Sequence, residues 1–510
     1  MRKLLPHLAC WSGSAHTSIF AILSIALWIH PLSLSSVNIP LQPGPSAADR
    51  DVLVVLYNTT DGNNWTNRTN WLTDNDLSTW HGVTALNGRV TSLDLEENNL
   101  TGEVPPQLGN LTSLDSLRLA RNKLSGEIPP QLGNLANLTV LDLWGNQLRG
   151  TIPVELGNLT NLRVLNLAGN ALGGGIPSFL SNLANLERLS LAGNQLRGNI
   201  PSFLGNMASL KGVDLGHNAL NGKIPPELGK LFNLEHLFLG YNALNGKIPP
   251  ELGKLSNLTW LFLNRNKLKG AIPVELANLS SLEWLYLTGN QLSGKIPPEL
   301  AKLSNLTRLA LHNNKLSGKI PPELAKLSNL TRLALHNNKL SGPIPVALAE
   351  LANLEWLFLN NNKLKSPIPV ALAELANLMW LALNNNRLSG KIPPELAKLS
   401  NLTRLAPHNN RLSGKIPPEL AKLSNLTQLA LHENKLSGKI PPELANLSNL
   451  THLWLGQNQL RGTLPRSLTR LTKLKRFHFE GRGGLCAPPD PGFQAWLQSI
   501  RDVNGPTCWR

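Results

Sequence analysis

One asparagine returns every 24 residues along most of the chain, without an insertion or a deletion. Self-similarity at a fixed period of this length is typical of stacked repeats and argues against a row of independent globular domains. Around each copy the frame reads LxxLxxLxLxxNxLxGxIPxxL, as in residues 303–321. The 16 copies, called the ladder asparagines below, are Asn98, Asn122, Asn146, Asn170, Asn194, Asn218, Asn242, Asn266, Asn290, Asn314, Asn338, Asn362, Asn386, Asn410, Asn434 and Asn458.

Each repeat predicts a short strand followed by two sharp bends. Leu309 and Leu311 alternate along the chain, so both point to one face of a strand and their neighbours point to the other. The amide of Asn314 can satisfy backbone groups that a bend leaves unpaired, and Gly318 tolerates the next bend. Pro321 then ends the strand. We therefore expect each repeat to form one coil, with strands of successive coils parallel and about 4.8 Å apart.

This frame resembles the leucine-rich repeats of the plant-specific subclass, from residue 91 to about residue 481. The resemblance implies an α/β solenoid, a right-handed leucine-rich-repeat superhelix with a concave parallel β-sheet, built here from 16 repeats of 24 residues. The family includes ectodomains of receptor-like kinases and polygalacturonase-inhibiting proteins. No kinase signature follows the repeats, so the chain resembles a stand-alone, kinase-less member.

The segments outside the repeats predict a targeting segment and two caps. The expected boundaries are a signal peptide at residues 1–36, a linker at 37–48, an N-terminal cap at 49–90, the repeats at 91–482 and a C-terminal cap at 483–510. The apolar run at residues 19–29 suits a signal-peptide core and is short for a membrane span of about 20 residues. We expect a secreted, extracellular protein; the alternative is a plasma-membrane protein held by an uncut signal anchor.

The two caps carry aromatic and cysteine signals. A helix is expected at residues 49–57, and Trp65, Trp71 and Trp80 are expected to pack against the first coil, because large aromatic side chains dominate burial in small caps. This cap resembles those of the family but lacks the cysteine pair of plant versions, as in algal, protist or bacterial secreted relatives. Cys486 and Cys508 are expected to form a disulfide in an exported protein; two free thiols or a redox pair are the alternative.

Function in a solenoid resides in the variable positions of its concave face. Aromatic residues gather there, six, four and two positions before the ladder asparagine, together with arginine and histidine. Exposed aromatic patches flanked by such residues are the usual makeup of an interaction hot spot; the alternative is that duplication copied them without a role. The candidate ligand-binding residues are His236, Phe238, Trp260, Phe262, Trp284, Tyr286, Arg308, His312, Arg332, His336, Trp356, Phe358, Trp380, Arg404 and Trp454.

The chain offers weak signals for metal binding and none for catalysis. His312 and His336 fall on adjacent strands, but two histidines without a nearby carboxylate make a weak metal site. Copying of two near-identical repeats explains this column better, so we predict no metal and no cofactor. There is no phosphate-binding loop, no paired acid and no nucleophile elbow, so we do not predict an enzyme.

The formal net charge is +16, from 48 basic and 32 acidic residues. Lysine recurs five positions after and twelve positions before the ladder asparagine, off the concave face. These columns could attract an anionic polysaccharide; solvated charge copied with the repeats is the alternative, and nucleic acid is not expected for an exported protein. The two columns are Lys223, Lys247, Lys295, Lys319, Lys391, Lys415 and Lys439, and Lys230, Lys254, Lys302, Lys326, Lys398 and Lys422.

Two residues depart from the frame. Fifteen of the 16 repeats carry glycine four positions after the ladder asparagine, and the remaining repeat has Ser366 there. If the glycine serves a positive φ, either Ser366 is strained or the bend is altered in this repeat. Pro407 replaces a strand leucine, so the sheet is expected to lose one hydrogen bond at this coil.

These features predict an extracellular or cell-surface recognition protein that binds a peptide, a protein or a cell-wall glycan on its concave face. One alternative is an inhibitor or co-receptor of a wall-degrading enzyme or receptor; another is a structural wall protein attached to anionic polysaccharide. The chain has 15 N-x-S/T sequons, which predict a glycoprotein in a eukaryotic secretory pathway. Alternatively, the recurring Asn-Leu-Thr serves the turn alone.

Overall fold

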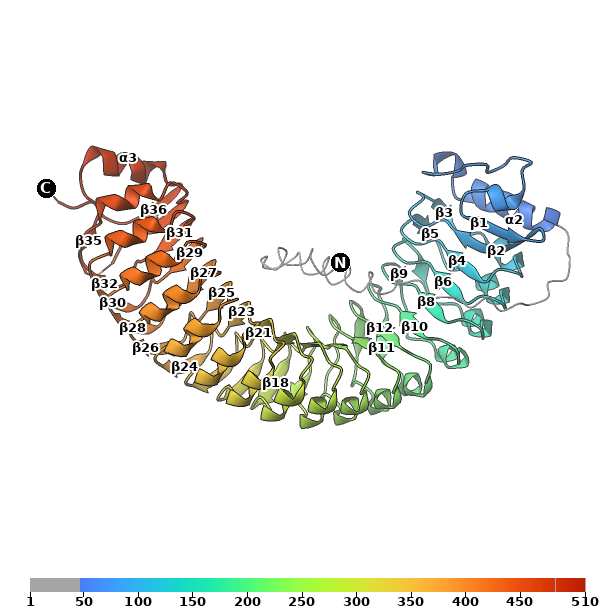
Figure 1. Cartoon of the computed structure of the whole chain (residues 1–510). Coiled ribbons are helices and arrows are strands. Elements are labelled where there is room, and N and C mark those ends of the chain that lie inside the picture. Colours follow the sequence, from blue (N-terminus) through green and yellow to red (C-terminus); the bar gives the residue numbers. More distant parts are fainter. Residues whose placement is uncertain (1–45, 482, 510) are drawn as a thin grey trace. The chain divides into compact units, whose positions relative to one another are not determined.

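The computed structural model describes residues 46–481 and 483–509. The predicted signal peptide therefore lies outside the described residues. The chain forms two compact units, whose boundary lies between Ala243 and Leu244. Both units consist of stacked coils that combine a strand of the main parallel sheet, a second short strand in most coils, and a 3-10 helix (Figure 1). Among the described residues, no helix has both the length and the apolar character that crossing a bilayer requires.

The main sheet contains one strand per coil, and successive strands pair in parallel at equivalent positions. Arg308 lies beside Arg332, for example, and Leu309 beside Leu333. An antiparallel hairpin of β1 and β2 begins this sheet in the first unit. The first unit contributes β1 Val83–Leu86, β2 Arg89–Asp94, β4 Ser116–Arg118, β6 Val140–Asp142, β8 Val164–Asn166, β10 Arg188–Ser190, β12 Gly212–Asp214 and β14 His236–Phe238. The second unit contributes β15 Trp260–Phe262, β17 Trp284–Tyr286, β19 Arg308–Ala310, β21 Arg332–Ala334, β23 Trp356–Phe358, β25 Trp380–Ala382, β27 Arg404–Ala406, β29 Gln428–Ala430, β31 His452–Trp454, β34 Arg476–His478 and β36 Asp502–Asn504.

Leucine fills the interior of each coil. Leu309 and Leu311 are completely buried, and so are Leu303, Leu306 and Leu316 of the same coil. The predicted alternation is confirmed, because the leucines face the interior while the residue between Leu309 and Leu311 points to the other side of the sheet. Each buried leucine contributes about 1.5–3 kcal/mol by leaving water, and stacking joins these small clusters into a continuous core within each unit.

The ladder asparagines join neighbouring coils through their side-chain amides. Asn314 Nδ2 donates to the carbonyl oxygen of Leu287 in the preceding coil at 3.0 Å and to that of Leu311 in its own coil at 3.1 Å. Its Oδ1 accepts the backbone N–H of Leu292 at 3.0 Å. The equivalent bonds recur at Asn338. This confirms that the asparagine satisfies backbone groups that the bend would otherwise leave unpaired.

The second bend, four residues after the ladder asparagine, has a positive φ. Gly318 and Gly342 have φ values of 83° and 84°, and Ser366 adopts 81° at the equivalent place, so the bend is unaltered and a serine takes the positive φ. The strands that lead into these bends form the second sheets. In the first unit these strands pair as β3 Thr101–Glu103 with β5 Lys123–Ser125, β7 Arg149–Gly150 with β9 Ala171–Leu172, and β11 Arg197–Asn199 with β13 Ala219–Asn221. In the second unit one continuous sheet contains β16 Lys269–Gly270, β18 Gln291–Gly294, β20 Lys315–Gly318, β22 Lys339–Gly342, β24 Lys363–Ser366, β26 Arg387–Gly390, β28 Arg411–Gly414, β30 Lys435–Gly438 and β32 Gln459–Leu460.

A 3-10 helix follows the Ile-Pro of the frame in each coil. The proline before it has φ near −65°, as at Pro321 before η12, which suits the entry into a helical turn. Each helix buries one leucine and turns its charged residues outward. These helices are η3 Pro106–Asn110, η4 Pro130–Asn134, η5 Val154–Asn158, η6 Ser178–Asn182, η7 Ser202–Asn206, η8 Pro226–Lys230, η9 Pro250–Lys254, η10 Val274–Asn278, η11 Pro298–Lys302, η12 Pro322–Lys326, η13 Val346–Glu350, η14 Val370–Glu374, η15 Pro394–Lys398, η16 Pro418–Lys422, η17 Pro442–Asn446 and η18 Arg466–Arg470.

The N-terminal end of the first unit is closed by helix α2 Ser46–Thr59, which contains the expected helical segment, and by η1 Gly62–Asn64 and η2 Leu77–Thr79. Trp65, Trp71 and Trp80 are buried beside it. The ring centroids of Trp65 and Trp71 lie 4.7 Å apart, and those of Trp71 and Trp80 lie 5.1 Å apart. The tryptophans are therefore buried as expected, and the ring contacts that bury them lie among the tryptophans of the cap itself.

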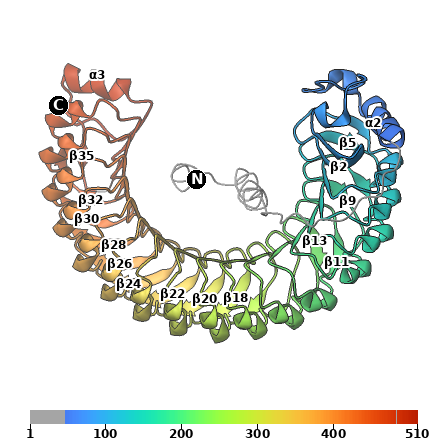
Figure 2. The ribbon, with the colours of Figure 1, turned by 45° about the vertical axis from the view of Figure 1, so that its right-hand side comes forward.

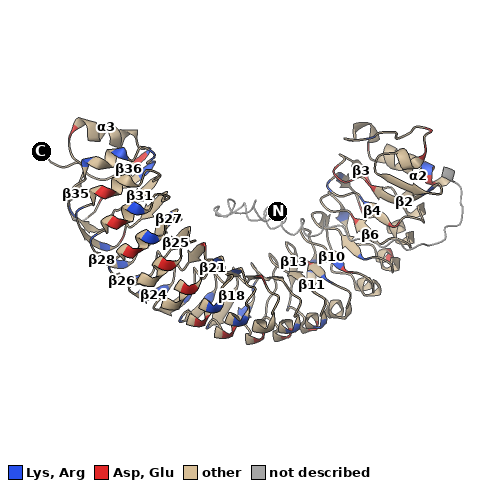
Figure 3. Ribbon diagram, viewed as in Figure 1, with Lys and Arg blue, Asp and Glu red and all other residues tan. Residues whose placement is uncertain are grey.

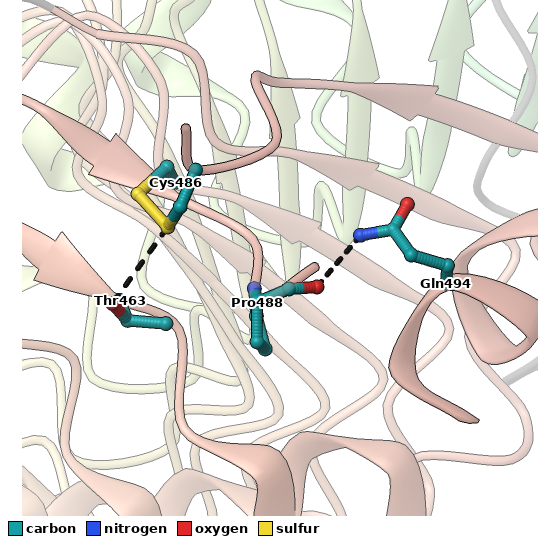
Figure 4. Close-up of a disulfide and its surroundings, with 5 residues drawn as sticks. Thr463, Cys486, Pro488 and Gln494 are labelled. Carbon is teal, nitrogen blue, oxygen red and sulfur yellow. Dashed lines mark hydrogen bonds between the residues drawn. A yellow bond between two sulfur atoms is a disulfide. The ribbon is translucent and has the colours of Figure 1, made fainter. Parts of the chain in front are cut away.

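The C-terminal end of the second unit is closed by helix α3 Pro491–Ser499 and by the pair β33 Gly462–Thr463 and β35 Leu485–Cys486. The predicted disulfide between Cys486 and Cys508 is present, with a Cα–Cα distance of 4.9 Å (Figure 4). Gln494 Nε2 on α3 donates to the carbonyl oxygen of Pro488 at 2.8 Å. The bridge and this bond hold the last helix against the final coils.

Pro407 weakens the main sheet at one coil. Strands β25 and β27 pair at three positions, whereas β27 and β29 pair only at Arg404 and Leu405. In the sister coil the N–H of Leu335 donates to the carbonyl oxygen of Phe358 at 2.9 Å. Pro407 has no N–H to donate, so the predicted loss of one ladder bond is confirmed.

Candidate ligand-binding face

Three rows of side chains cover the main-sheet face that lies opposite the buried leucines. They occupy the positions six, four and two residues before each ladder asparagine, and we call them the Trp/Arg row, the central row and the His row. Their common orientation follows from the period-2 alternation of a strand. Because strands pair at equivalent positions, residues of one row from successive coils are direct neighbours.

The first aromatic cluster of the second unit is a stack of rings from β15 and β17. The rings of Trp260 and Trp284 lie 4.6 Å apart and nearly parallel, at 7°. Phe262 and Tyr286 of the central row lie 4.8 Å apart. The guanidinium of Arg308, from the next strand, covers the Trp284 ring at 4.1 Å. A cation over an indole face is attracted by the ring quadrupole, so the stack continues from indole to guanidinium.

A second cluster lies on β21 to β27. Arg332 covers Trp356 at 4.4 Å, and Arg404 covers Trp380 at 4.5 Å. Phe358 of the central row meets the edge of Trp380 at 4.7 Å. Trp356 and Trp380 remain half-buried over a buried cluster that includes Phe358. In the Trp/Arg row, pairs of indoles are therefore followed or preceded by arginines, and each guanidinium stacks on one indole.

The central row is less accessible than the sequence suggests. Phe238, Phe262, Tyr286 and Phe358 are all buried, with at most 8% of their surface exposed. Their rings lie between the two flanking rows, and the tilted and stacked contacts with the indoles cover them. The expectation of an exposed central column is wrong for these residues, and the Trp/Arg row is the part of the face that a ligand can reach.

The His row consists of stacked pairs. The ring centroids of His312 and His336 are 4.2 Å apart, as are those of His408 and His432. Burial, reinforced by Arg332, lowers the pKa of His336 to about 4. Burial, reinforced by His432, lowers the pKa of His408 to about 4. His336 and His408 are therefore neutral at pH 7. The described residues contain no group of three or more potential metal ligands.

The remaining predicted residues lie apart from these clusters. His236 and Phe238 belong to the first unit, with ring centroids 6.0 Å apart, and burial lowers the pKa of His236 to about 4, with a smaller contribution from Arg188. Trp454 lies near the C-terminal cap, 5.0 Å from the ring of His452. The structure brings the other predicted residues together as neighbours on the second unit's sheet.

One feature was missed by reasoning from the sequence. Exposed asparagines directly before the ladder asparagine form a second amide chain, in which Asn409 Nδ2 donates to Asn385 Oδ1 at 2.7 Å. The recurring Asn-Asn pair was the available signal. In the first unit the central row is polar, and burial raises the pKa of Asp142 to about 6 against hydrogen bonds from the Trp144 N–H and the Asn166 side chain.

Family models match most of the repeat region. A model described as a leucine-rich repeat region matches residues 89–223, and one described as a leucine rich repeat matches residues 246–292, 304–364 and 328–388. A third leucine rich repeat model matches residues 233–255, 425–447 and 449–471. No curated protein sequence matches the chain.

Solved structures from plants and from a bacterium are similar over most of the chain. The ectodomain of the Arabidopsis thaliana receptor kinase GASSHO1/SCHENGEN3 is 34% identical with a TM-score of 0.64, over 90% of this chain and 64% of that ectodomain, so the chain spans less than two thirds of it. The ectodomain of the Arabidopsis receptor kinase HAESA is 30% identical with a TM-score of 0.66, over 90% of this chain and 85% of its own. A Leptospira interrogans leucine-rich-repeat protein is 31% identical with a TM-score of 0.58, over 80% of this chain and 94% of its own.

The ladder asparagines, the parallel one-strand coils and these similarities agree with one another. The chain belongs to the leucine-rich-repeat family.

Proposed function

We propose that the chain is an extracellular recognition protein that binds an extended peptide or protein segment along the main-sheet face of its second unit. The observation that supports this most directly is the Trp/Arg row, in which Arg308, Arg332 and Arg404 each lie over an indole. Two similar structures are complexes of this kind: HAESA with an IDA peptide hormone ligand and GASSHO1/SCHENGEN3 with CASPARIAN STRIP INTEGRITY FACTOR 2.

The physical advantage of this row is preorganisation. A free arginine side chain loses rotamer entropy when it binds a ligand, whereas a guanidinium already stacked on an indole has lost most of that freedom. The half-buried faces of Trp356 and Trp380 supply apolar area beside the charges. Tryptophan and arginine are also the residues that dominate binding hot spots. The row therefore suits a segment with alternating apolar and polar groups.

The proposal is tested by panning a displayed random-peptide library against the full-length protein. Peptides enriched on the wild type should bind Trp356→Ala/Trp380→Ala at least about tenfold more weakly, as expected for loss of two hot-spot aromatics. Phe232→Ala is the matched control, because this ring is 59% exposed and lies off the face. Trp284 and Tyr286 are unsuitable targets, since both are buried and their removal would perturb packing.

Equal binding to the double variant and the control would overturn the proposal, and so would a failure of the wild type to enrich any peptide. Melting curves of all three proteins establish whether a loss of binding reflects the face or the fold.

A further inference from the structure

The second unit has a second sheet, and the outer face of this sheet differs in composition from the main-sheet face. Strands β16 to β32 lie side by side as one parallel sheet (Figure 2). Their alternation buries leucines such as Leu316 and Leu340 completely. The residues one and three positions after each ladder asparagine therefore share the outer face of this sheet, and the residue five positions after it follows directly on the bend that ends each strand. We call this surface the second-sheet face.

The charges on the second-sheet face have a single sign. From the coil of Asn290 to that of Asn458, no position on the described part of this face holds aspartate or glutamate; the other residues are mainly serine, with glutamine, proline and threonine. No ion pair among the described residues involves one of its cations. The cations, all exposed, are Lys295, Lys315, Lys319, Lys339, Lys363, Lys365, Arg387, Lys391, Arg411, Lys415, Lys435, Lys439 and Arg461.

Neighbouring glycines fix the direction of these lysines. A Cβ added to Gly342 would lie 3.0 Å from Cγ of Lys319, and one added to Gly414 would lie 3.1 Å from Cγ of Lys391. The lysine stem of one coil thus lies over the glycine of the next coil. The glycine, which the sequence explains by its positive φ, also leaves room for the stem, because a side chain there would force the stem to shift by a few tenths of an ångström.

The register places hydroxyl groups between the charges. Ser317 pairs with Lys339 across β20 and β22, and Ser341 pairs with Lys363 across β22 and β24. Each strand advances the surface by about 4.8 Å, so cations and serines recur at short, regular intervals. The second-sheet face between the cations is polar and carries no aromatic side chain.

This chemistry selects among polyanions. Clustered cations also attract an anionic bilayer, but surfaces that enter the headgroup region add apolar side chains, and single-stranded nucleic acid is bound with aromatic side chains that stack on the bases; the second-sheet face offers neither kind of side chain. An acidic polysaccharide needs regularly spaced cations for its carboxylates and small polar side chains for its hydroxyls. The matching face of the first unit is mixed in sign, since Glu103 and Glu127 occupy the lysine position there. Most acidic residues of the second unit lie on its 3-10 helices (Figure 3), and none occupies a described position of the second-sheet face.

We propose that the second-sheet face is a binding site for a linear acidic polysaccharide, independent of the ligand on the main-sheet face. Attraction of this kind depends on many exposed charges and is screened by salt. The site would attach the protein to a polyuronate while leaving the Trp/Arg row accessible.

The test measures binding of sodium polygalacturonate to the full-length protein by calorimetry over a salt series. The site variant is Lys319→Gln/Lys391→Gln/Lys415→Gln/Lys439→Gln. The matched control is Lys302→Gln/Lys326→Gln/Lys398→Gln/Lys422→Gln, which removes the same charge from the 3-10 helices. The site variant should bind at least about tenfold more weakly and show a shallower dependence on salt, while the control changes less than about twofold.

If both variants lost the same affinity for polygalacturonate, net charge alone would explain the binding, and the proposal would be overturned. Absence of wild-type binding near physiological ionic strength would overturn it as well. Vesicles with anionic lipid and a DNA duplex are run in parallel, and equal affinity for either one would refute the choice of a polysaccharide. Melting curves confirm that the quadruple variants remain folded.

Discussion

At Ser366 the chain places a side chain in a backbone conformation that its other coils reserve for glycine. Its φ of 81° lies among the glycine values of the neighbouring coils, 84° at Gly342 and 78° at Gly390. The stacked coils impose this geometry, because hydrogen bonds on both sides fix the bend. Ser366 therefore carries backbone strain in an otherwise regular solenoid.

Ser366→Gly should stabilise the protein by about 0.5–1 kcal/mol, because glycine adopts the positive φ without strain but gains freedom in the unfolded chain. Denaturant unfolding measures the change. The reverse substitution Gly342→Ser is the control and should destabilise by a similar amount or more, since its Cβ would also meet the Lys319 stem. A lower stability of Ser366→Gly would show that the bend does not need glycine.

The stacked histidines predict a pH dependence of stability. Their folded-state pKa of about 4, at His336 and His408, is below the ordinary 6.5, so between these values the unfolded chain binds protons that the folded chain does not. Stability should be full above about pH 6.5, fall as the pH drops toward 4, and level off below it. His336→Asn/His408→Asn should flatten this slope, since Asn360 and Asn384 already occupy the row in other coils.

Unfolding in denaturant at a series of pH values measures the slope, and the difference between wild type and variant isolates the histidines. Asp142 acts in the opposite sense, because its raised pKa favours folding as the pH falls. An unchanged slope in the double variant would contradict the assignment to the His row.

At the scale of single elements, strand β27 is the weak point of the main sheet. Pro407 takes the place of a core leucine and leaves one carbonyl of β29 without its ladder donor. Its own carbonyl still accepts from Asn410 and Asn434, at 3.0 Å and 3.2 Å. The asparagine ladder therefore remains intact where the sheet does not.

Pro407→Leu should raise stability by about 2–3 kcal/mol at most, the usual cost of a missing core leucine, reduced by the volume of the pyrrolidine ring. Backbone amides at residues 406–409 should exchange faster in the wild type than those at residues 334–337, and the substitution should make the two coils alike. Hydrogen exchange read by mass spectrometry distinguishes them, and equal exchange in the wild type would contradict the prediction.

The recurring Asn-Leu-Thr is a second element whose role the structure clarifies. Asn329 Nδ2 donates to the carbonyl oxygen of Ser304 at 2.9 Å, and the Thr331 hydroxyl donates to that of Thr307 at 3.1 Å. Asn353 and Asn377 make the same amide bond without a following threonine. These sequons thus serve the turn between coils, whether or not they carry glycans.

Asn329→Ala should destabilise the protein by about 0.5–1.5 kcal/mol, the net value of one such hydrogen bond. Asn278→Ala, at an exposed sequon at the end of η10, should change stability by less than about 0.5 kcal/mol. Thermal melting of protein made without glycosylation measures both, and equal effects would show that the amide bond adds nothing.

At the scale of the whole molecule, a solenoid is nearly one-dimensional, so each coil feels only its neighbours. The disulfide between Cys486 and Cys508 should therefore act locally. Its reduction should cost about 3 kcal/mol, as for a loop of this length, and speed exchange in β34 and β36 while leaving β19 and β21 unchanged. Exchange measured with and without reductant tests this, and a uniform acceleration would contradict quasi-one-dimensional behaviour.

The repeat frame is enough to predict the coil: the strand alternation, the ladder bonds, the positive φ after the ladder asparagine and the missing hydrogen bond at Pro407. Each of these features depends on one residue type at one position of the repeat. Because the period is constant, the same local geometry recurs in every coil. The sequence also assigned the three rows to one sheet face, because a strand's alternation leaves no other choice.

The way in which these rows fill space depends on tertiary packing. Burial of Phe262 and Phe358, the stacking of Arg308 on Trp284, and the pairing of the histidines depend on rotamers and on neighbours one coil away, which periodicity does not fix. The sequence showed the lysine column five positions after the ladder asparagine, but not that serines and further cations lie beside it, because that arrangement depends on the two-residue offset between successive strands. Local rules specify which way a side chain points, whereas packing specifies which of its atoms remain for a ligand.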